Sequence, residues 1–223
     1  MAEKVLFSWS GGKDSAMALQ TISGDQRYEV VGLLTTVTEG HNRISMHGVR
    51  EALLEQQASS IGLPLSKVFL SQNSSNEEYE ARMKEAMLKT REAGVSAVAF
   101  GDIFLYEIKK YRQSNLEKVG MNGIFPIWAK DNLPQMFFDL GFKAIVTCVD
   151  AKVLDAKFAG RLFDREFIDE LPTSVDPNGE NGEFHSFVFD GPIFRKRISY
   201  KIGEVIKKDS FYFCDLQPQD VPK

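Results

Sequence analysis

The sequence predicts an α/β protein with a doubly wound parallel sheet, followed by a smaller C-terminal α+β part. Three observations lead to this fold class. Short apolar runs alternate with helical patterns up to Trp128, a turn rich in glycine and serine follows the first apolar run, and the alternation stops after Trp128. Strands that are buried on both faces and separated by helices are typical of parallel sheets with right-handed crossovers.

The first part is expected to contain five strands and four helices. The apolar runs predict strands at Val5–Phe7, Val30–Val37, Pro64–Leu70, Val95–Phe100 and Ile124–Trp128. Apolar residues at helical spacing predict helices at Ala16–Ile22, Val49–Ile61, Glu77–Arg91 and 107–120. Acidic residues open the third helix and Gly94 ends it, as expected for a helix dipole and a glycine stop signal. In such a sheet a ligand binds beyond the carboxyl ends of the strands.

The regular alternation of apolar runs and helical patterns is lost in the second part. The residues after Trp128 predict a helix at Gln135–Leu140, a strand at Lys143–Val149, a short helix at Asp164–Glu170, and strand-like stretches at Glu183–Phe189 and Tyr200–Phe213. We therefore expect a first domain over residues 1–130, and a second, α+β domain over residues 131–223.

Residues 8–15 read SWSGGKDS and have the composition of a phosphate-binding turn. Gly11 and Gly12 lack Cβ atoms, so the backbone can turn several N–H groups toward an anion, and the following helix adds the positive end of its dipole. Lys13 supplies positive charge, and Asp14 caps the helix or assists a metal. The Walker and dinucleotide patterns do not fit this segment. The alternative is an ordinary strand-turn-helix corner. The expected nucleotide-binding residues here are Ser8, Ser10, Gly11, Gly12, Lys13, Asp14 and Ser15.

Two further segments are expected at the same edge of the sheet. Thr35, Thr36 and the loop through His47 follow the second predicted strand, and Gly101 and Asp102 follow the fourth. We expect these residues to contact the nucleotide or its metal. Arg50, just after His47, either pairs with a phosphate or carboxylate or is a solvated residue at a helix start.

A second group of ionisable residues lies between Val175 and Phe194. This glycine-rich segment carries Glu180, Glu183 and His185 close together. A carboxylate beside an imidazole suits proton transfer or the binding of ammonium. The alternative is a polar hairpin with solvated acids.

The composition of the chain argues against several classes of function. The formal net charge is −4 and the longest basic run is Arg195–Arg197, so nucleic-acid binding is not expected. No segment has the length of a membrane span and no signal-peptide pattern follows Met1, so we expect a cytoplasmic protein without membrane contact. Cys148 and Cys214 are expected to be buried core thiols, with a catalytic thiol at Cys148 as the alternative.

Four segments carry a resemblance to a known family. The SGGKDS turn resembles the PP-loop of the N-type ATP pyrophosphatases, which cleave ATP between its α and β phosphates. Together with Gly101-Asp102-Ile103, Pro126-Ile127-Trp128 and GENGEFHSFVFDGPIF, it resembles the diphthine–ammonia ligase family along nearly the whole chain. The resemblance implies a Rossmann-like, adenine nucleotide alpha hydrolase-like ATP domain, followed by a family-specific C-terminal domain.

The same resemblance implies a reaction. A carboxylate is activated by ATP and Mg²⁺, AMP and pyrophosphate are released, and ammonia forms the amide. The carboxylate is protein-borne diphthine or a small molecule; in a bacterium, diphthamide is not expected. The expected catalytic residues are Lys13, Glu180, Glu183 and His185. The ion is expected to be held through the ATP phosphates, with Asp14 or Asp102 assisting. Relatives often carry a cysteine where this chain has Asn178, so no thiol role transfers to that position.

Two other functions remain open from the sequence. Sulfur or amine transfer on another substrate also uses PP-loop adenylation, but sulfur transfer to tRNA would want CxxC cysteines or a basic extension, which this chain lacks. A non-catalytic ATP- or AMP-binding protein could use the same turn. A homodimer is compatible with the sequence, since it is the commonest soluble assembly.

Overall fold

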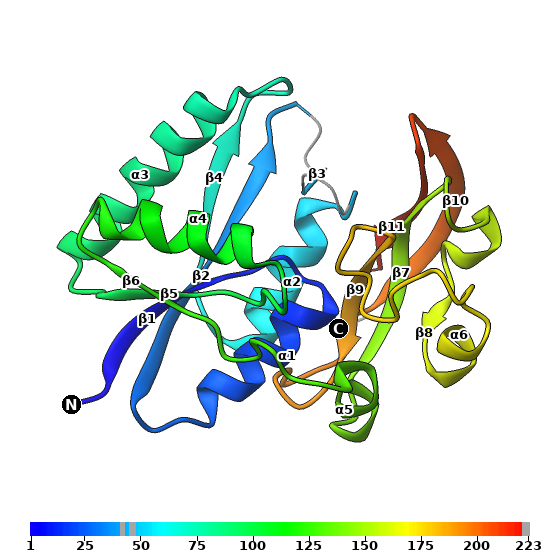
Figure 1. The fold of residues 1–223 in the computed structure, drawn as a ribbon, viewed down its shortest axis with the longest axis horizontal. Helices are drawn as coiled ribbons and strands as arrows, with labels where there is room; N and C mark the ends of the chain where they lie inside the picture. The colour runs from blue at the N-terminus through cyan, green and yellow to red at the C-terminus, as the bar shows by residue number, and fades with distance from the viewer. Residues whose placement is uncertain (41–42, 45–47, 220–223) are drawn as a thin grey trace. The chain divides into compact units, whose positions relative to one another are not determined.

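A computed structural model describes residues 1–40, 43–44 and 48–219 of the chain (Figure 1). The described residues form two compact units. The first comprises residues 1–10, 14–40 and 63–130, and the second comprises residues 11–13, 43–44, 48–62 and 131–219. The division into domains at residue 130 remains a prediction. None of the described helices is long and apolar enough to cross a membrane.

A parallel sheet forms the centre of the first unit. Its strands are β1 (Glu3–Ser8), β2 (Tyr28–Thr38), β4 (Leu65–Leu70), β5 (Ala97–Ala99) and β6 (Asn122–Ile124). The spatial order is β4-β2-β1-β5-β6, with every neighbouring pair parallel. In this register Val5 lies between Val30 and Ala97. The order reverses between β1 and β5, so the doubly wound α/β fold class is confirmed.

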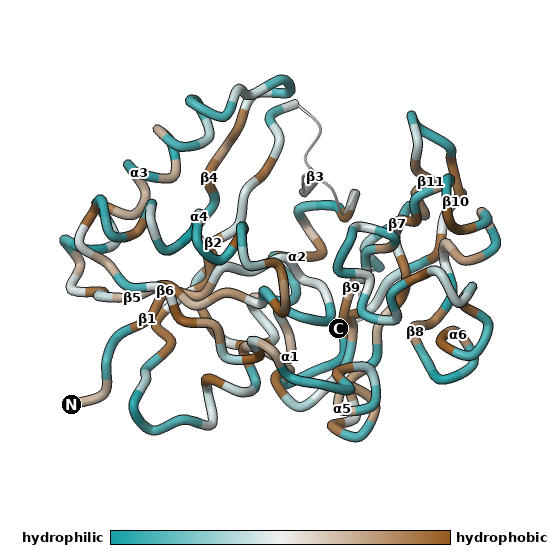
Figure 2. Tube along the Cα trace, in the orientation of Figure 1, coloured by the Kyte–Doolittle hydropathy of each residue, from teal (hydrophilic) through white to brown (hydrophobic). Residues whose placement is uncertain are grey.

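Three helices accompany this sheet: α1 (Lys13–Ser23), α3 (Asn76–Glu92) and α4 (Tyr106–Glu117). Ser75 caps α3 by accepting a hydrogen bond from the backbone N–H of Glu78 at 3.2 Å. α3 and α4 are largely polar, and they bury Met87 and Leu116 against the sheet residues Leu34 and Val98. Figure 2 shows the contrast between the hydrophilic stretches of α3 and the apolar centre of β1.

The second unit is built on an antiparallel sheet. Its strands are β7 (Lys143–Asp150), β8 (Leu162–Phe163), β9 (Phe184–Asp190), β10 (Tyr200–Lys208) and β11 (Phe211–Pro218). The order is β10-β11-β7-β8, and β9 also pairs with β7. The remaining elements are β3 (Arg43–Ile44), α2 (Glu51–Ile61), α5 (Leu133–Asp139), the 3₁₀ helix η1 (Ala156–Phe158) and α6 (Arg165–Asp169).

Phenylalanine rings dominate the core of this second unit. Phe163 contacts the rings of Phe137, Phe167 and Phe184 at centroid distances of 5.5, 5.7 and 5.8 Å. Such tilted and edge-on arrangements suit the aromatic quadrupole. An antiparallel sheet with short helices confirms the α+β part that the sequence predicted after the parallel sheet.

Three sequence expectations differ from the structure. The last parallel strand is Asn122–Ile124, and residues 126–129 form a turn. The stretch Tyr200–Phe213 contains a hairpin, because Asp209 adopts a positive φ of 53° between β10 and β11. Thr35 and Thr36 do not follow their strand but lie within it, since β2 continues to Thr38.

Candidate nucleotide and substrate site

The turn predicted to bind phosphate lies between β1 and α1, as expected from the sequence. Ser8 ends β1, and Lys13 is the first residue of α1. The backbone N–H of Trp9 donates to the carbonyl of Leu34 at 2.7 Å, which ties the turn to β2. Ser10 Oγ donates to Ser15 Oγ at 3.1 Å. The turn therefore closes on itself and ends at the positive pole of α1, where an anion is favoured.

The tip of this turn needs glycine. Gly11 has φ +78°, and a Cβ atom there would lie 2.7 Å from Gln57 Oε1 and 3.0 Å from Leu54 Cδ2. Its carbonyl oxygen accepts hydrogen bonds from the backbone N–H of Val188 at 2.9 Å and from Gln57 Nε2 at 3.1 Å. The tip is thereby held within the second unit by β9 and α2.

Lys13 has a buried side chain, with 6% of its surface exposed. Its Nζ donates to the carbonyl oxygen of Asn178 and lies 5.6 Å from the ring centre of Phe184 and 5.9 Å from that of Phe163. Its backbone N–H donates to Ser186 Oγ at 3.1 Å. A carbonyl and aromatic faces suit an ammonium group away from water. The structure thus brings Lys13 together with the glycine-rich segment that the sequence singled out.

Glu183 anchors that segment. Its side chain is 7% exposed and accepts hydrogen bonds from the backbone N–H groups of Asp176 at 3.2 Å and Asn181 at 3.0 Å, and from Asn181 Nδ2 at 3.0 Å. Burial alone would raise the pKa of Glu183, but these donors outweigh it, so its pKa lies below the usual value. Glu180 lies in the same loop, where its backbone N–H donates to Asp176 Oδ2 at 3.4 Å.

Asn178 and His185 complete this cluster. Asn178 Oδ1 is buried and has no hydrogen-bond partner among the described residues. Burial, together with the positive charge of Lys13, lowers the pKa of His185 to about 4. The imidazole is therefore neutral at pH 7, while Lys13 is the neighbouring cation.

Gly101 and Asp102 follow β5 as expected. A Cβ at Gly101 would lie 2.9 Å from the backbone nitrogen of Ser15, so glycine allows the loop to approach the start of α1 closely. Asp102 forms an ion pair with Arg112 of α4, with 2.7 Å between Oδ2 and Nε. The guanidinium of Arg112 also lies 4.5 Å from the ring centre of Phe100. Asp102 is thus occupied by an arginine in this state.

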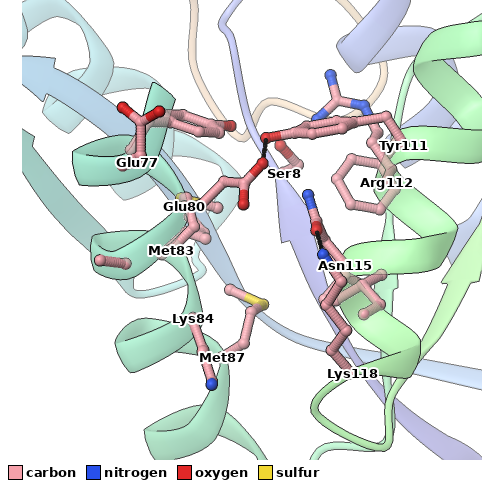
Figure 3. Close-up of a pocket in the computed structure, with 16 residues that line it drawn as sticks. Ser8, Glu77, Glu80, Met83, Lys84, Met87, Tyr111, Arg112, Asn115 and Lys118 are labelled. Atoms are coloured by element: carbon pink, nitrogen blue, oxygen red, sulfur yellow. Dashed lines mark hydrogen bonds between the residues drawn. The ribbon is translucent and has the colours of Figure 1, made fainter. Parts of the chain in front are cut away.

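A cavity of about 420 Å³ lies between α3 and α4 in the first unit (Figure 3). Tyr111 of α4 donates to Glu80 of α3 at 3.1 Å, as the dashed line in Figure 3 shows. The remaining wall is mainly apolar, and its size is that of a small-molecule pocket. The cavity is lined by residues of β1 and β2, by the residue that follows β5, and by residues of α3 and α4. They include Ser8, Leu34, Phe100, Met83, Met87 and Arg112.

The other residues that the sequence predicted at the site are not found in the wall of this cavity as the structure describes it. Thr35 and Thr36 lie within β2, and neither contributes to the wall of this cavity as the structure describes it. His47 lies outside the described residues. Arg50 pairs with Asp215, with 2.8 Å between Nη2 and Oδ2, and 41% of its side chain remains exposed.

The two cysteines are buried, and burial raises the pKa of Cys148 to about 12. This fits the expected core thiols and gives no support to a catalytic thiolate. The sequence analysis missed Gln57 and Arg112. Gln57 stands four residues after Leu53 on the buried face of α2, where a polar side chain is unusual. No sequence signal pointed to Arg112.

Comparison with known proteins gives a consistent result. The model for the diphthamide synthase N-terminal domain matches residues 3–123, and the model for the diphthamide synthase C-terminal domain matches residues 130–219. A similar protein is the diphthine–ammonia ligase of Schizosaccharomyces pombe, 28% identical over 241 residues. The match covers 96% of this chain, and the chain spans 39% of the length of that relative. The resemblance seen in the sequence is confirmed, and the chain belongs to the diphthamide synthase family.

Proposed function

We propose that this protein is an ATP-dependent ligase that adenylates a carboxylate, releases pyrophosphate, and transfers ammonia to the activated acid. The observation that carries the proposal is the match to both halves of the diphthamide synthase family, in order, with the predicted phosphate turn inside the first half. The name of the Schizosaccharomyces pombe relative supports diphthine as the carboxylate.

The nucleotide is assigned to the turn and to the cavity of the first unit. The backbone of the turn and the start of α1 suit the triphosphate. The cavity suits the nucleoside, because Ser8 belongs to both the turn and the cavity wall, and Leu34 and Phe100 give it apolar surface.

Lys13 and the serine hydroxyls are proposed to stabilise the negative charge of the phosphates at the turn. As pyrophosphate leaves, negative charge grows on its oxygens, and prearranged donors stabilise it. Mg²⁺ bridging phosphate oxygens would neutralise part of this charge. Asp14 and Asp102 are the two carboxylates proposed to assist the ion, and Asp102 is paired with Arg112 in this structure.

Ammonia transfer is assigned to the loop around Asn178. Lys13 of the turn contacts this loop inside one unit, so the motif lies beside the tip of the phosphate turn. The buried Asn178 Oδ1 fits an N–H donor such as ammonium, because an unpaired buried acceptor is costly. Glu183 accepts three hydrogen bonds, and both Glu180 and Glu183 are candidates to take a proton from ammonium. Neutral His185 assists.

The test measures products. The purified chain is incubated with ATP, Mg²⁺, ammonium chloride and an elongation factor that carries diphthine, and the nucleotides are separated. We expect AMP and pyrophosphate in amounts that match amide formation, and no amide without ammonium. ADP as the product would contradict the proposal, and ATP binding without any turnover would favour a non-catalytic nucleotide-binding protein.

The role of Glu183 is tested separately with Glu183→Gln. An anchoring role predicts a lower melting temperature with an unchanged KM for ammonium in the remaining folded protein. A raised KM for ammonium at unchanged KM for ATP would return Glu183 to the ammonia step.

A further inference from the structure

Gln57 is a buried polar residue that the proposed chemistry does not use. It lies in α2 beside Leu53, Leu54 and Ala58, and none of its surface is exposed. The preceding Gln56 is only partly buried. A fully buried amide is costly unless its groups are hydrogen-bonded, so the contacts of Gln57 call for an explanation.

The side chain of Gln57 joins two segments that are far apart in the sequence. Its Nε2 donates to the carbonyl of Gly11 at 3.1 Å and to the carbonyl of Val188 at 2.6 Å. The backbone N–H of Val188 donates to the same Gly11 carbonyl at 2.9 Å. The Gly11 carbonyl is therefore fixed by two donors, one from α2 and one from β9.

Fixing this carbonyl also fixes the next N–H group. The peptide between Gly11 and Gly12 is planar and trans, so its C=O and N–H point in opposite directions. Glycine is otherwise the residue with the greatest backbone freedom, and Gly11 has a positive φ of 78°. Without the two donors, this peptide could rotate and turn the Gly12 N–H away from a bound anion.

We infer that Gln57 is a positioning residue for ATP: it orients the Gly11–Gly12 peptide, so that the tip of the turn is prearranged for the triphosphate. The inference rests on the proposed function, because it takes the turn to be the triphosphate site. It adds a residue that touches no substrate and acts through the backbone of the turn. Preorganised donors need no reordering when the ligand binds, so their loss lowers affinity.

The experiment compares three variants by calorimetric titration with ATP and Mg²⁺. Gln57→Leu removes both side-chain hydrogen bonds, and we expect about tenfold weaker ATP binding, which corresponds to about 1.4 kcal/mol. Gln56→Leu is the matched control on the same helix, with binding unchanged.

Gln57→Glu supplies a readout that a merely structural role would not move. A carboxylate at this position would face two carbonyl oxygens, whereas a protonated carboxyl group can donate one hydrogen bond again. Burial and the carbonyl dipoles raise the pKa of such a group. We expect the ratio of variant to wild-type affinity to be low at pH 8 and to recover in part at pH 5.5, while the ratio for Gln57→Leu stays constant.

The outcomes separate the two claims. Wild-type protein that does not bind ATP would overturn the proposed function. Wild-type protein that binds ATP, with Gln57→Leu binding equally well and Gln57→Glu showing no pH-dependent ratio, would overturn the role of Gln57. Melting curves of each variant at both pH values identify a loss of folding, and affinities are compared only under conditions in which the variant is folded.

Discussion

Lys13 and His185 share a buried environment in which one group carries the positive charge. Lys13 Nζ is held by the Asn178 carbonyl and the rings of Phe163 and Phe184. Burial and this nearby charge keep the pKa of His185 at about 4. A neutral imidazole beside a buried ammonium can accept or donate a hydrogen bond, but it does not compete with Lys13 for an anion.

The lowered pKa of His185 predicts a pH dependence of stability. Between pH 6.5 and about 4 the unfolded chain binds a proton that the folded protein does not, so stability falls as the pH falls. From pH 7 to pH 4.5 we expect the free energy of unfolding to drop by about 2–3 kcal/mol more in the wild type than in His185→Gln. Urea unfolding at both pH values measures this difference. Equal pH slopes for the two proteins would show that His185 titrates normally.

At the scale of elements, the loop after β5 and the start of α1 approach each other closely. At Gly101, a Cβ would lie 3.0 Å from the carbonyl carbon of Asp14 and from Ser15 Cα. These are backbone atoms in the first turn of a helix, so they cannot rotate aside as a flexible side chain would. The residue before Asp102 therefore sets the distance between β5 and the phosphate turn.

Gly101→Ala is expected to push these two elements apart. We expect a loss of about 1–3 kcal/mol in the free energy of unfolding, typical of overpacking, together with weaker ATP binding. Gly24→Ala is the control, because a Cβ there would meet its nearest neighbour, the carbonyl oxygen of Thr21, at an ordinary 3.6 Å. Denaturant unfolding and ATP titration check both variants. If Gly101→Ala and Gly24→Ala were equally stable, the loop after β5 would accommodate the added methyl group by a small shift.

Two elements could not be predicted from local sequence patterns. Asn122–Ile124 pairs with Ala97–Ala99 although asparagine and glycine are poor strand formers, because the register of the sheet outweighs local preference. The apolar run from Ile124 misled the prediction, since Pro126 cannot donate a ladder hydrogen bond. The hairpin turn at Asp209 lacks the glycine or asparagine that usually marks such a turn.

At the scale of the whole molecule, the net charge and the buried cysteines argue against sulfur transfer to tRNA. The formal net charge is −4, and the chain has two cysteines, both buried. Neither a basic surface for phosphates nor exposed thiols for sulfur transfer is expected.

We therefore predict no salt-dependent binding of labelled tRNA in fluorescence anisotropy at moderate ionic strength. A protein that neutralises several phosphates loses affinity steeply as salt rises. A steep salt slope here would reopen sulfur transfer to tRNA as the function.

The candidate site was only partly predictable. The SGGKDS turn is local in sequence, so its strand, glycines and helix start could be read from adjacent residues. The partners of Lys13 and Gly11 come from residues more than 40 positions away, and such contacts depend on packing that periodicity does not encode. The cavity between α3 and α4 likewise follows from how two polar helices cover a sheet.

The hydrogen bonds of α2 limit where the chain can be divided into separate fragments. Ser60 Oγ contacts the backbone of Lys196, and the carbonyl of Ser60 accepts from the N–H of Arg195 at 2.9 Å. Gln57 likewise needs the carbonyl of Val188. A fragment that stops at residue 130 keeps α2 but loses these partners. The N-terminal half is therefore not an interchangeable module, and recombination at that boundary would have to carry the C-terminal half along with it.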